Sequence, residues 1–451
     1  MATNSFQERE VVVIGLGYVG LTLAAHVSSL GISVLGIEVR DLVLNRLKSK
    51  QSFFYEPGLD KLLAQTLESG TFRYSSKLES SAIPRIFVIT VGTPIDTQKI
   101  VLEESIIRVA SEVSNVMNDN DLIILRSTVK LNTTREIIQP ILDESEKKYF
   151  LAFCPERTLE GAALQELGKL PQVIGGINEE STKQAAEFFS LITSTVVKVR
   201  NAETAELIKL VDNVQRDIKF AIANEIADIC NSENIKASEV ISLGKLGYPR
   251  TDLPFPGPVG GPCLEKDTYI LAESLQKKSK FPSIAVAARQ VNEEMINKVS
   301  DFVVMWFTKN QDSIDYPKVA ILGMAFKGIP ETNDLRGSPS LALFSQLKSK
   351  LLHSTDVALW DPVISLNEAA ESGFVFTEDL PNALQGANCV ILANNHPQIT
   401  SFSLNDLANL SGRRVLIYDL WGRFDDLRKF PDNLEYSSWG SHGFLEEGNS
   451  I

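Results

Sequence analysis

The sequence predicts an α/β protein with two doubly wound domains joined by a central helical domain that contains a long helix. Short apolar runs alternate with helical stretches up to about residue 200, and the alternation resumes near residue 316. Between these regions, the stretch from Ala202 to Asn231 contains neither Gly nor Pro, which predicts one connecting or dimer-forming helix. A second helix is expected from Ser283 to Lys309. We therefore expect three domains, comprising residues 1–200, 201–312 and 313–451.

The composition excludes several classes of protein. A chain of 451 residues with 44% hydrophobic and 22% charged residues is typical of a soluble globular protein. Its net charge of −13 argues against a nucleic-acid binder. No run of about 18 apolar residues occurs and residues 1–10 are polar, so we expect neither a membrane span nor a signal peptide.

The cysteines and histidines indicate a cytoplasmic protein without a metal site. The four cysteines, at positions 154, 230, 263 and 389, lack paired spacing, which favours reduced thiols over a disulfide framework. Four histidines and the lack of a CxxC motif argue against zinc. We also expect the acidic segment after Trp439 to be mobile.

Residues 10–40 predict a Rossmann-like strand–turn–helix–strand unit. An apolar run over residues 11–14 suits a central parallel strand, and a helix over residues 21–30 and a strand over 33–37 follow. The turn between them is Gly15-Leu16-Gly17-Tyr18-Val19-Gly20. Its glycines permit a pyrophosphate to approach the helix N-terminus, and Glu38 can hold a ribose 2′-hydroxyl. Glu38 favours NAD over NADP, while Arg40 keeps NADP open.

The α/β pattern continues on both sides of the central helices. Further strands are expected at residues 85–91, 121–126, 148–153, 173–176, 194–199, 319–322, 357–361, 389–393 and 415–420, with helices at 59–67 and 340–348. Two strands end in Gly92-Thr93-Pro94 and Ser127-Thr128-Val129, at the sheet edge where open α/β folds bind ligands. The C-terminal region resembles a nucleotide-binding domain without a GxGxxG motif of its own.

A loop rich in proline and glycine, residues 255–267, delivers a single thiol. Cys263 is followed by Lys266 and Asp267, and one helical turn starting near Cys263 would place the three side chains on one face. A helix N-terminus and a cation both favour the thiolate, which attacks carbonyl groups. The alternative is a turn that caps a helix and holds an inert cysteine.

A polar stripe on the long helix is the other candidate site. Glu206, Lys209 and Asn213 project from the same helix face. The alternative is an ordinary solvated face.

Read together, these segments resemble the UDP-glucose/GDP-mannose dehydrogenase family of nucleotide-sugar 6-dehydrogenases, from residue 11 to about residue 423. The polar stripe is part of the resemblance, and the other motifs are GLGYVGL (15–21), YEPGL (55–59), VGTP (91–94), STV (127–129), CPER (154–157), GGPCLEKD (260–267) and FK…DLRGSP (326–339). The resemblance implies an NAD-binding first domain, a central domain that carries the catalytic cysteine and forms the dimer, and a sugar-nucleotide-binding third domain.

The resemblance also implies a four-electron oxidation. The C6 hydroxyl of a nucleotide-linked hexose would become a carboxylate with two NAD+ and no released aldehyde, feeding polysaccharide biosynthesis. Cys263 would capture the aldehyde as a thiohemiacetal, which becomes a thioester. Glu156 would steer water onto that thioester.

Four further residues are implied in the first oxidation. Asp267, with a water near Thr128, would take the hydroxyl proton. Lys209 and Asn213 would stabilise the oxyanion at C6.

Binding residues follow from the same match. The implied cofactor contacts are Gly15, Gly17, Tyr18, Val19, Gly20, Glu38, Arg40, Thr93, Thr128, Glu160, Lys266 and Arg336. The implied contacts of the sugar nucleotide are Leu159, Glu160, Lys209, Asn213, Phe255, Gly260 and Lys327. Arg250 resembles the family arginine that reaches into the neighbouring subunit, which implies a homodimer or a higher oligomer; the alternative is an ordinary surface arginine.

Some positions depart from the family pattern. Pro262 replaces the usual His or Ser before the cysteine, and Glu38 replaces a shorter Asp. Lys130-Leu131-Asn132 stands where proline and glycine are usual.

The substrate is only partly defined by the sequence. The CPER motif favours UDP-N-acetylmannosamine or UDP-N-acetylglucosamine, with UDP-glucose and GDP-mannose as alternatives. A two-electron NAD dehydrogenase and a catalytically silent binding protein are the other functions considered, and the presence of Cys263 with Lys209 and Asn213 argues against both.

Overall fold

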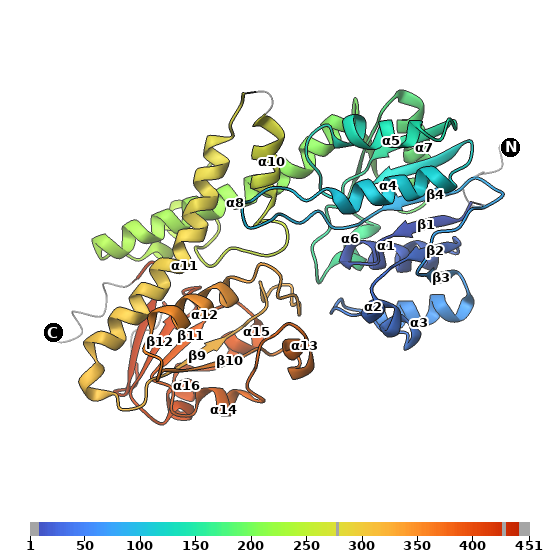
Figure 1. Cartoon of the computed structure of the whole chain (residues 1–451). Coiled ribbons are helices and arrows are strands. Elements are labelled where there is room, and N and C mark those ends of the chain that lie inside the picture. Colours follow the sequence, from blue (N-terminus) through green and yellow to red (C-terminus); the bar gives the residue numbers. More distant parts are fainter. Residues whose placement is uncertain (1–8, 277–278, 426–429, 442–451) are drawn as a thin grey trace. The chain divides into compact units, whose positions relative to one another are not determined.

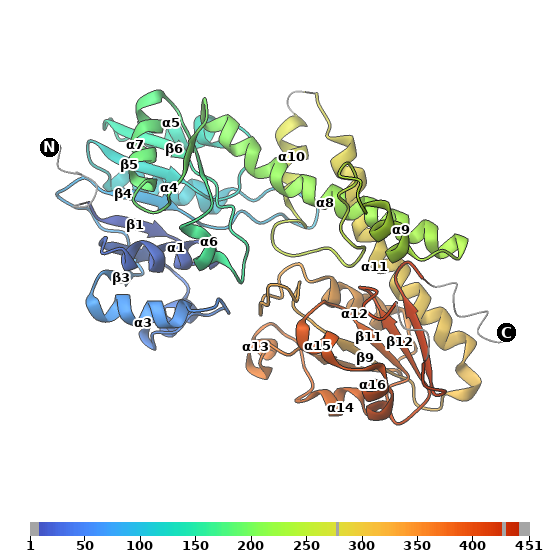
Figure 2. The same cartoon turned by 180° about the vertical axis from the view of Figure 1, so that it is seen from behind.

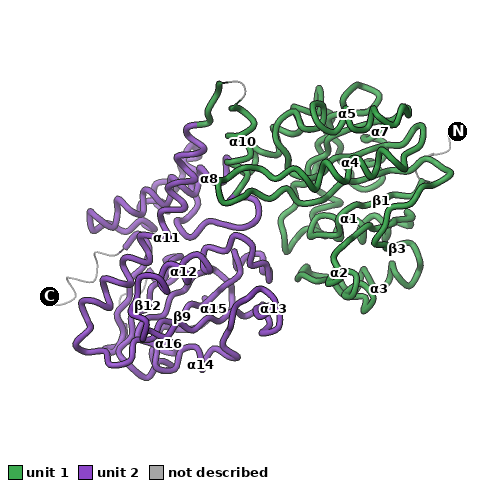
Figure 3. Tube along the Cα trace, in the orientation of Figure 1, with its two compact units in different colours: residues 1–213, 266–282 green, residues 214–265, 283–451 purple. Residues whose placement is uncertain are grey.

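The computed structural model describes residues 9–276, 279–425 and 430–441 (Figure 1). We expected the segment after Trp439 to be mobile, and its residues beyond 441 lie outside the described residues. The chain forms two compact units, residues 1–213 with 266–282 and residues 214–265 with 283–451 (Figure 3). Each unit contains a largely or wholly parallel sheet, and one long helix, residues 202–233, runs from the first unit into the second, so the predicted fold class is confirmed.

The first unit is built on an eight-stranded sheet of order β3-β2-β1-β4-β5-β6-β7-β8, in which only the β6–β7 pair is antiparallel. Its strands are β1 Val11–Ile14, β2 Val34–Ile37, β3 Phe72–Ser75, β4 Ile86–Ile89, β5 Asp121–Leu125, β6 Tyr149–Phe153, β7 Gln172–Gly176 and β8 Val196–Lys198. Its helices are α1 Tyr18–Ser29, α2 Asp41–Lys48, α3 Leu59–Ser69, α4 Glu104–Val116, η1 Thr134–Ile138, α5 Gln139–Asp143, α6 Ala163–Leu167 and α7 Glu179–Phe189.

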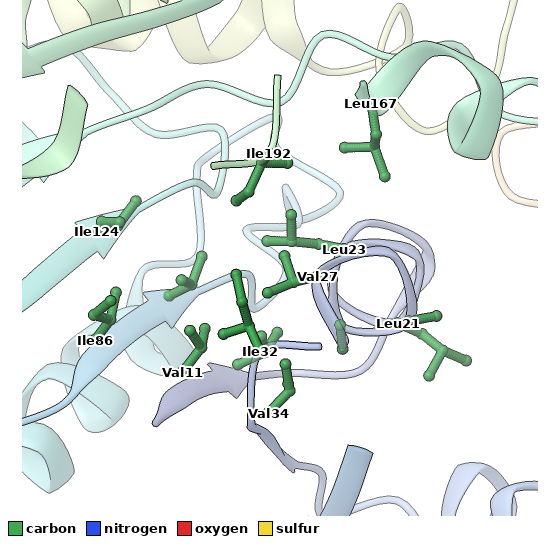
Figure 4. Close-up of a cluster of buried hydrophobic side chains, with 14 of the residues drawn as sticks. Val11, Leu21, Leu23, Val27, Ile32, Val34, Ile86, Ile124, Leu167 and Ile192 are labelled. Carbon is green, nitrogen blue, oxygen red and sulfur yellow. The ribbon is translucent and has the colours of Figure 1, made fainter. Parts of the chain in front are cut away.

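The central strands of this sheet are apolar throughout because helices cover both faces. Val11 and Val13 pack on one side, with Leu23 and Val27 of α1 (Figure 4). Val12 and Ile14 point to the other side and pack with α4. Strands buried on both faces lose the alternation of polar and apolar residues, which is why the sequence showed them as continuous apolar runs.

Four helices follow or flank the cysteine loop. They are α8 Ala202–Glu233, α9 Ala237–Gly244, α10 Asp267–Gln276 and α11 Ser283–Lys309. The two predicted long helices are confirmed, and α8 continues two residues beyond the predicted end. In the second unit, the C-terminal half of α8 packs against α11 (Figure 2). Within the described part of the chain, no helix is both long and apolar enough to cross a membrane.

The second unit holds a five-stranded parallel sheet of order β10-β9-β11-β12-β13. Its strands are β9 Lys318–Leu322, β10 Asp356–Trp360, β11 Cys389–Leu392, β12 Val415–Asp419 and β13 Leu434–Ser438. Its remaining helices are η2 Gln311–Ser313, α12 Pro339–Lys350, α13 Leu366–Glu371, α14 Leu380–Leu384, α15 Pro397–Ser401 and α16 Leu404–Ser411. Helices α11 and α12 pack on one face and α14 and α16 on the other, so this sheet is also doubly wound.

The first strand of each sheet ends in the same kind of turn. The glycine after the strand has a positive φ in both cases, +93° at Gly15 and +91° at Gly323. The amide of the next residue donates a hydrogen bond to an acidic side chain at the end of the neighbouring strand, to Glu38 at 3.1 Å and to Asp361 at 2.7 Å. The C-terminal domain therefore repeats this corner of the Rossmann unit although its sequence lacks GxGxxG.

Candidate active site

The turn between β1 and α1 leaves an open space at the start of the helix. Gly17 precedes α1, a Cβ on it would meet nothing within 4 Å, and no side chain caps the helix there. Gly20, in contrast, is so close to the turn that a Cβ would lie 1.9 Å from the Gly15 carbonyl oxygen. Because the amides of the first helical turn lack partners within the helix, this turn can hold a pyrophosphate.

The Glu38 carboxylate at the end of β2 is buried and already has donors. It accepts hydrogen bonds from the backbone amides of Val39 and Arg40, both at 2.9 Å, and from the Arg40 guanidinium at 2.8 Å. Burial favours a raised pKa, but the hydrogen bonds and charge of Arg40 outweigh it and hold the pKa of Glu38 below its usual value. Because the Arg40 side chain is 51% exposed, it can leave the carboxylate free for a ribose hydroxyl.

The loops after β4 and β5 are joined through Thr93, which also binds Lys266. The Thr93 hydroxyl donates to the carbonyl of Thr128, and the Lys266 ammonium donates to the carbonyl of Thr93 at 2.9 Å. The structure thus brings together three residues that the sequence assigned to the dinucleotide site.

The unusual segment Lys130-Leu131-Asn132 fits this arrangement. Lys130 forms ion pairs with Glu103 at 2.7 Å and with Glu273 of α10 at 2.9 Å. Asn132 has a φ of +75°, a conformation that glycine adopts freely and asparagine tolerates. The substitutions therefore preserve the turn and add a link to α10.

Glu206 of the polar stripe anchors the same loop. Its buried carboxylate accepts hydrogen bonds from the amides of Asn132 at 2.6 Å and Thr134 at 2.8 Å, and from the Thr134 hydroxyl at 2.6 Å. Burial raises the pKa of Glu206 to about 7, against the opposing effect of these hydrogen bonds. Glu206 therefore holds the segment that follows the STV motif.

Lys209, one helical turn further along α8, contacts the CPER motif. Its ammonium donates to the carbonyl of Glu156 at 2.6 Å. The Glu156 carboxylate is held by Arg126 at 2.5 Å and by the amides of Arg157 and Thr158, both at 2.7 Å. Burial alone favours a raised pKa, but the charge of Arg126 and these bonds hold the pKa of Glu156 below its usual value. Glu156 is thus kept as a carboxylate.

Asn213 and Asp267 form a buried pair. The Asn213 amide donates to Asp267 Oδ2 at 2.6 Å, and Asp267 is 1% exposed. The other oxygen, Oδ1, has no hydrogen-bond partner among the residues that the structure describes. Burial raises the pKa of Asp267, while Lys266, Lys209 and the Asn213 hydrogen bond oppose the change. A buried carboxylate oxygen without a partner is typical of a group that accepts a proton.

The remaining predicted residues of the first unit surround these contacts. Leu159 and Glu160 are half-buried in a loop held by the Glu56 carboxylate, which accepts the Gly161 amide at 2.8 Å. Tyr18 and Val19 are half-buried in the first turn of α1.

In the second unit, Cys263 lies in a turn before helix α10. The prediction that a helix starts near Cys263 is wrong, because α10 begins at Asp267. Residues 262–266 form turns and no helix, because Pro262 has no amide to donate and Gly261 takes a φ of +94°.

Cys263 differs from the other cysteines in its exposure. None of the four is in a disulfide, and Cys263 alone of the four is only half-buried. Burial raises the pKa of the thiols of Cys154, Cys230 and Cys389. Cys263 is therefore the cysteine that a reactant can reach most readily.

Further predicted residues of the second unit lie in this loop and in the C-terminal domain. A Cβ on Gly260 would lie 2.2 Å from the Gly337 carbonyl oxygen, so only glycine fits there. Phe255 is exposed, and Lys327 lies 5.3 Å from the Phe326 ring centre. Arg336, predicted to contact the dinucleotide, forms an ion pair with Asp334 at 2.6 Å.

Arg250, the residue predicted to reach a neighbouring subunit, is exposed. Its guanidinium lies 5.3 Å from the ring centre of Tyr248.

Comparison with known families accounts for these motifs. Three models of the UDP-glucose/GDP-mannose dehydrogenase family match the chain: the NAD binding domain at residues 9–193, the central domain at 203–294 and the UDP binding domain at 320–426. The chain belongs to the UDP-glucose/GDP-mannose dehydrogenase family. The resemblance inferred from the motifs is confirmed, and the protein is an NAD-dependent nucleotide-sugar dehydrogenase.

Relatives in the family share most of its length. The chain is 29% identical to the UDP-N-acetyl-D-mannosamine dehydrogenase of Methanococcus vannielii, covering 92% of this chain and 94% of the relative. It is 31% identical to the enzyme of that name from Campylobacter jejuni, covering 76% and 84%. The structure of the UDP-D-ManNAc dehydrogenase from Pyrococcus horikoshii superposes with a TM-score of 0.84 at 26% identity, covering 96% and 99%.

The first unit fits the cofactor that the family requires. The open space at Gly17 leaves room for a phosphate at the start of α1, and the cradle formed at Gly15 and Gly20 would be filled by any larger side chain. Glu38 is placed at the strand end where a ribose hydroxyl would bind.

Sequence reasoning missed Arg126 in this site. Its buried guanidinium fixes Glu156 and also donates to the carbonyl of Cys154 at 3.1 Å and to Gln172 at 2.8 Å. The available signal was a charged residue directly after the apolar strand β5 and directly before the STV motif.

We expect opposite changes in cofactor preference from Glu38→Ala and Arg40→Ala. Loss of Glu38 removes the negative charge that repels a 2′-phosphate and leaves Arg40 to attract it, so the NAD+/NADP+ ratio of kcat/KM should fall at least about tenfold. Loss of Arg40 should raise the ratio, because Glu38 is then unopposed. Steady-state kinetics with both cofactors measure the effect, and a shift in the same direction for both variants would contradict this role of the pair.

The acidic limb of the pH–rate profile should report Asp267. A general base works only when deprotonated, and burial raises the pKa of Asp267, so kcat should fall with decreasing pH before an ordinary carboxyl, with a pKa of about 3.9, would protonate. Asp267→Asn should reduce kcat by about 10²–10⁴-fold and remove this limb. An unchanged limb in the variant would assign it to another group.

Proposed function

We propose that the chain oxidises UDP-N-acetyl-D-mannosamine at C6 to the uronic acid, in two successive two-electron steps. The substrate class is supported by the relatives of that name, which align over almost the whole chain, and by the CPER motif that the sequence shares with this branch. The observation that carries the chemistry is the polar face of α8, where Lys209 and Asn213 are buried and hold the carbonyl of Glu156 and the carboxylate of Asp267.

The first oxidation requires loss of the C6 hydroxyl proton. When bound, NAD+ supplies the acceptor for the hydride that leaves C6 in each oxidation. Asp267 Oδ1 is the base, through a water near Thr128, since this oxygen has no partner among the described residues. The Lys209 ammonium and the Asn213 amide stabilise the negative charge that develops on the C6 oxygen.

The second oxidation proceeds on the enzyme. Cys263 adds to the aldehyde and forms a thiohemiacetal, which loses a hydride and a proton to become a thioester. Glu156, held as a carboxylate by Arg126, orients the water that hydrolyses the thioester to the carboxylate and the free thiol. Covalent attachment keeps the sugar on the enzyme between the two oxidations.

The proposed substrate is tested by a panel of sugar nucleotides. UDP-N-acetylmannosamine should give two NADH per sugar and the highest kcat/KM among the panel, with UDP-N-acetylglucosamine, UDP-glucose and GDP-mannose as competitors. A higher kcat/KM for any of these three would replace the assignment, and one NADH per sugar would contradict the four-electron reaction.

Cys263→Ser and Lys209→Ala should separate the nucleophile from the oxyanion stabiliser. A serine hydroxyl is a far weaker nucleophile near neutral pH, so Cys263→Ser should lose turnover by orders of magnitude while binding both ligands. Any sugar adduct it traps is visible by intact mass spectrometry. Lys209→Ala should lose turnover without an adduct, and a Cys263→Ser enzyme with near wild-type turnover would exclude the covalent mechanism.

We also propose that the enzyme is a homodimer formed through α8 and α9, with Arg250 reaching the neighbouring subunit. Large apolar side chains are exposed on the second unit's part of these helices and just after α9, among them Ile229 at 55%, Leu243 at 59% and Leu246 at 77%. We take these exposed apolar side chains as part of the contact surface between the subunits.

Charges on this surface should dissociate the dimer. We expect Ile229→Asp with Leu246→Asp to halve the mass measured by light scattering, since an unpaired charge would be buried in the contact. Val375→Asp is the control, because Val375 is 90% exposed in the C-terminal domain. A fully active monomeric wild type would refute both the surface and the role of Arg250.

A further inference from the structure

Four buried polar side chains connect helices α8 and α11 in the second unit. Asp217 and Asn224 lie on α8, Arg289 and Asn292 lie on α11, and each is at most 2% exposed. Arg289 pairs with the Asp217 carboxylate at 2.9 Å, and the Asn292 amide donates to the same carboxylate at 2.8 Å. The Asn224 amide in turn donates to the Asn292 side-chain oxygen at 2.9 Å. The four side chains thus form one continuous network.

This network holds the cysteine loop at three points. The Asn224 side chain accepts the Gly257 amide at 2.9 Å and donates to the Gly257 carbonyl at 3.1 Å. The Arg289 guanidinium donates to the carbonyls of Val259 and Leu264, both at 3.2 Å. Since Val259 and Leu264 lie on either side of Cys263 in the chain, Arg289 fixes the loop before and after the thiol.

The loop cannot hold itself in this way. Residues 251–260 form no helix or strand, and the prolines at 254, 256, 258 and 262 have no amide to donate. Buried backbone carbonyls need donors, and the planar guanidinium of Arg289 supplies several in a fixed geometry.

Stability alone does not account for the network. A buried ion pair is often no more stable than apolar residues of similar volume, because both charges must leave water. Its particular contribution is a defined geometry for the groups it contacts. Here those groups are the carbonyls that bracket Cys263.

A second contact fixes the same loop from the C-terminal domain. The Gly261 amide donates to the Gly337 carbonyl at 2.8 Å, and a Cβ on Gly261 would lie 2.4 Å from the Phe326 ring. The backbone segment just before Cys263 is therefore held both by the helices α8 and α11 and by the C-terminal domain.

We propose that Arg289, oriented by Asp217 and Asn292, is a positioning residue that sets the place of the Cys263 thiol, with Asn224 fixing the start of the same loop. The inference rests on the proposed role of Cys263 as the nucleophile. A misplaced thiol slows capture of the aldehyde but leaves the first oxidation intact. If Arg289 positions the thiol, its loss should let the aldehyde intermediate escape from the enzyme. A loss of protein stability alone would not release the aldehyde.

The test compares Arg289→Lys with Lys298→Met. Lysine keeps the positive charge beside Asp217 but loses the fork that reaches two carbonyls, so kcat should fall at least about tenfold, since misplacement by about 1 Å can cost about 10²-fold. KM for the sugar nucleotide should stay within about twofold because the change acts after binding. NADH per sugar should fall from two toward one, with the released aldehyde trapped by hydroxylamine, and alkylation of Cys263 by iodoacetamide should change in rate.

Lys298→Met is the matched control. Lys298 pairs with Asp228 at 2.5 Å and so links the same two helices, and within the described part of the chain this half-exposed pair forms no hydrogen bond or ion pair with the loop. All four readouts should stay at wild-type values in this variant. If Arg289→Lys does not fold, Asn224→Ala, which releases Gly257 without unpairing Asp217, carries the same test.

A folded Arg289→Lys enzyme with wild-type kcat and two NADH per sugar would overturn the proposal. The Cys263→Ser experiment decides the nucleophile separately. If that variant remains active, the proposed mechanism fails, while the iodoacetamide rate still reports whether Arg289 sets the position of the thiol.

Discussion

A buried charge needs a partner, and several buried ionic side chains of this chain find partners on other segments. Arg126 holds Glu156, Arg289 holds Asp217, and the Glu206 carboxylate holds backbone amides of the loop after β5. Because these pairs are shielded from water, each fixes the relative position of the segments it joins. One carboxylate oxygen of Asp217 and one of Asp267 lack a hydrogen-bond partner among the described residues, and Asp267 is the one of the two that is bonded to Asn213 of the polar stripe. These pairs hold the site together, and Asp267 Oδ1 is available for chemistry.

Much of the fold could be predicted from the sequence because its central strands are apolar on both faces and its long helices lack Gly and Pro. The two strands that were missed, β3 and β13, show why the rest could not. They lie at sheet edges and carry polar residues, so their sequences, Phe72–Ser75 and Leu434–Ser438, resemble loops. Helix α1 starts at Tyr18, three residues before the expected position, because the last glycine of the turn, Gly20, already belongs to the helix.

The site was predictable where a motif carries the chemistry and unpredictable where support comes from far along the chain. Lys209, Asn213 and Asp267 were expected together, and the first unit places them in contact with one another or with CPER. Arg289 and Asn292 appear in the sequence as ordinary polar residues of a helix. Only the folded chain shows that they are buried and face Asp217, 72 and 75 residues earlier.

The repeated corner of the two sheets bears on how many cofactors the chain can hold at once. Asp361 accepts the amides of Met324, Ala325, Val363 and Ile364, so a ribose would have to displace the protein's own backbone there. At Glu38 the backbone amides of Leu16, Val39 and Arg40 also bind the carboxylate, but the half-exposed Arg40 guanidinium is a side-chain donor that can move aside. Among the described residues, this corner therefore has a side-chain donor that a ribose can replace in the first unit, and only backbone donors in the second. On the proposed mechanism, the first NADH must leave and a fresh NAD+ must arrive while the sugar stays in place, so the lifetime of the bound sugar has to exceed the time of cofactor exchange.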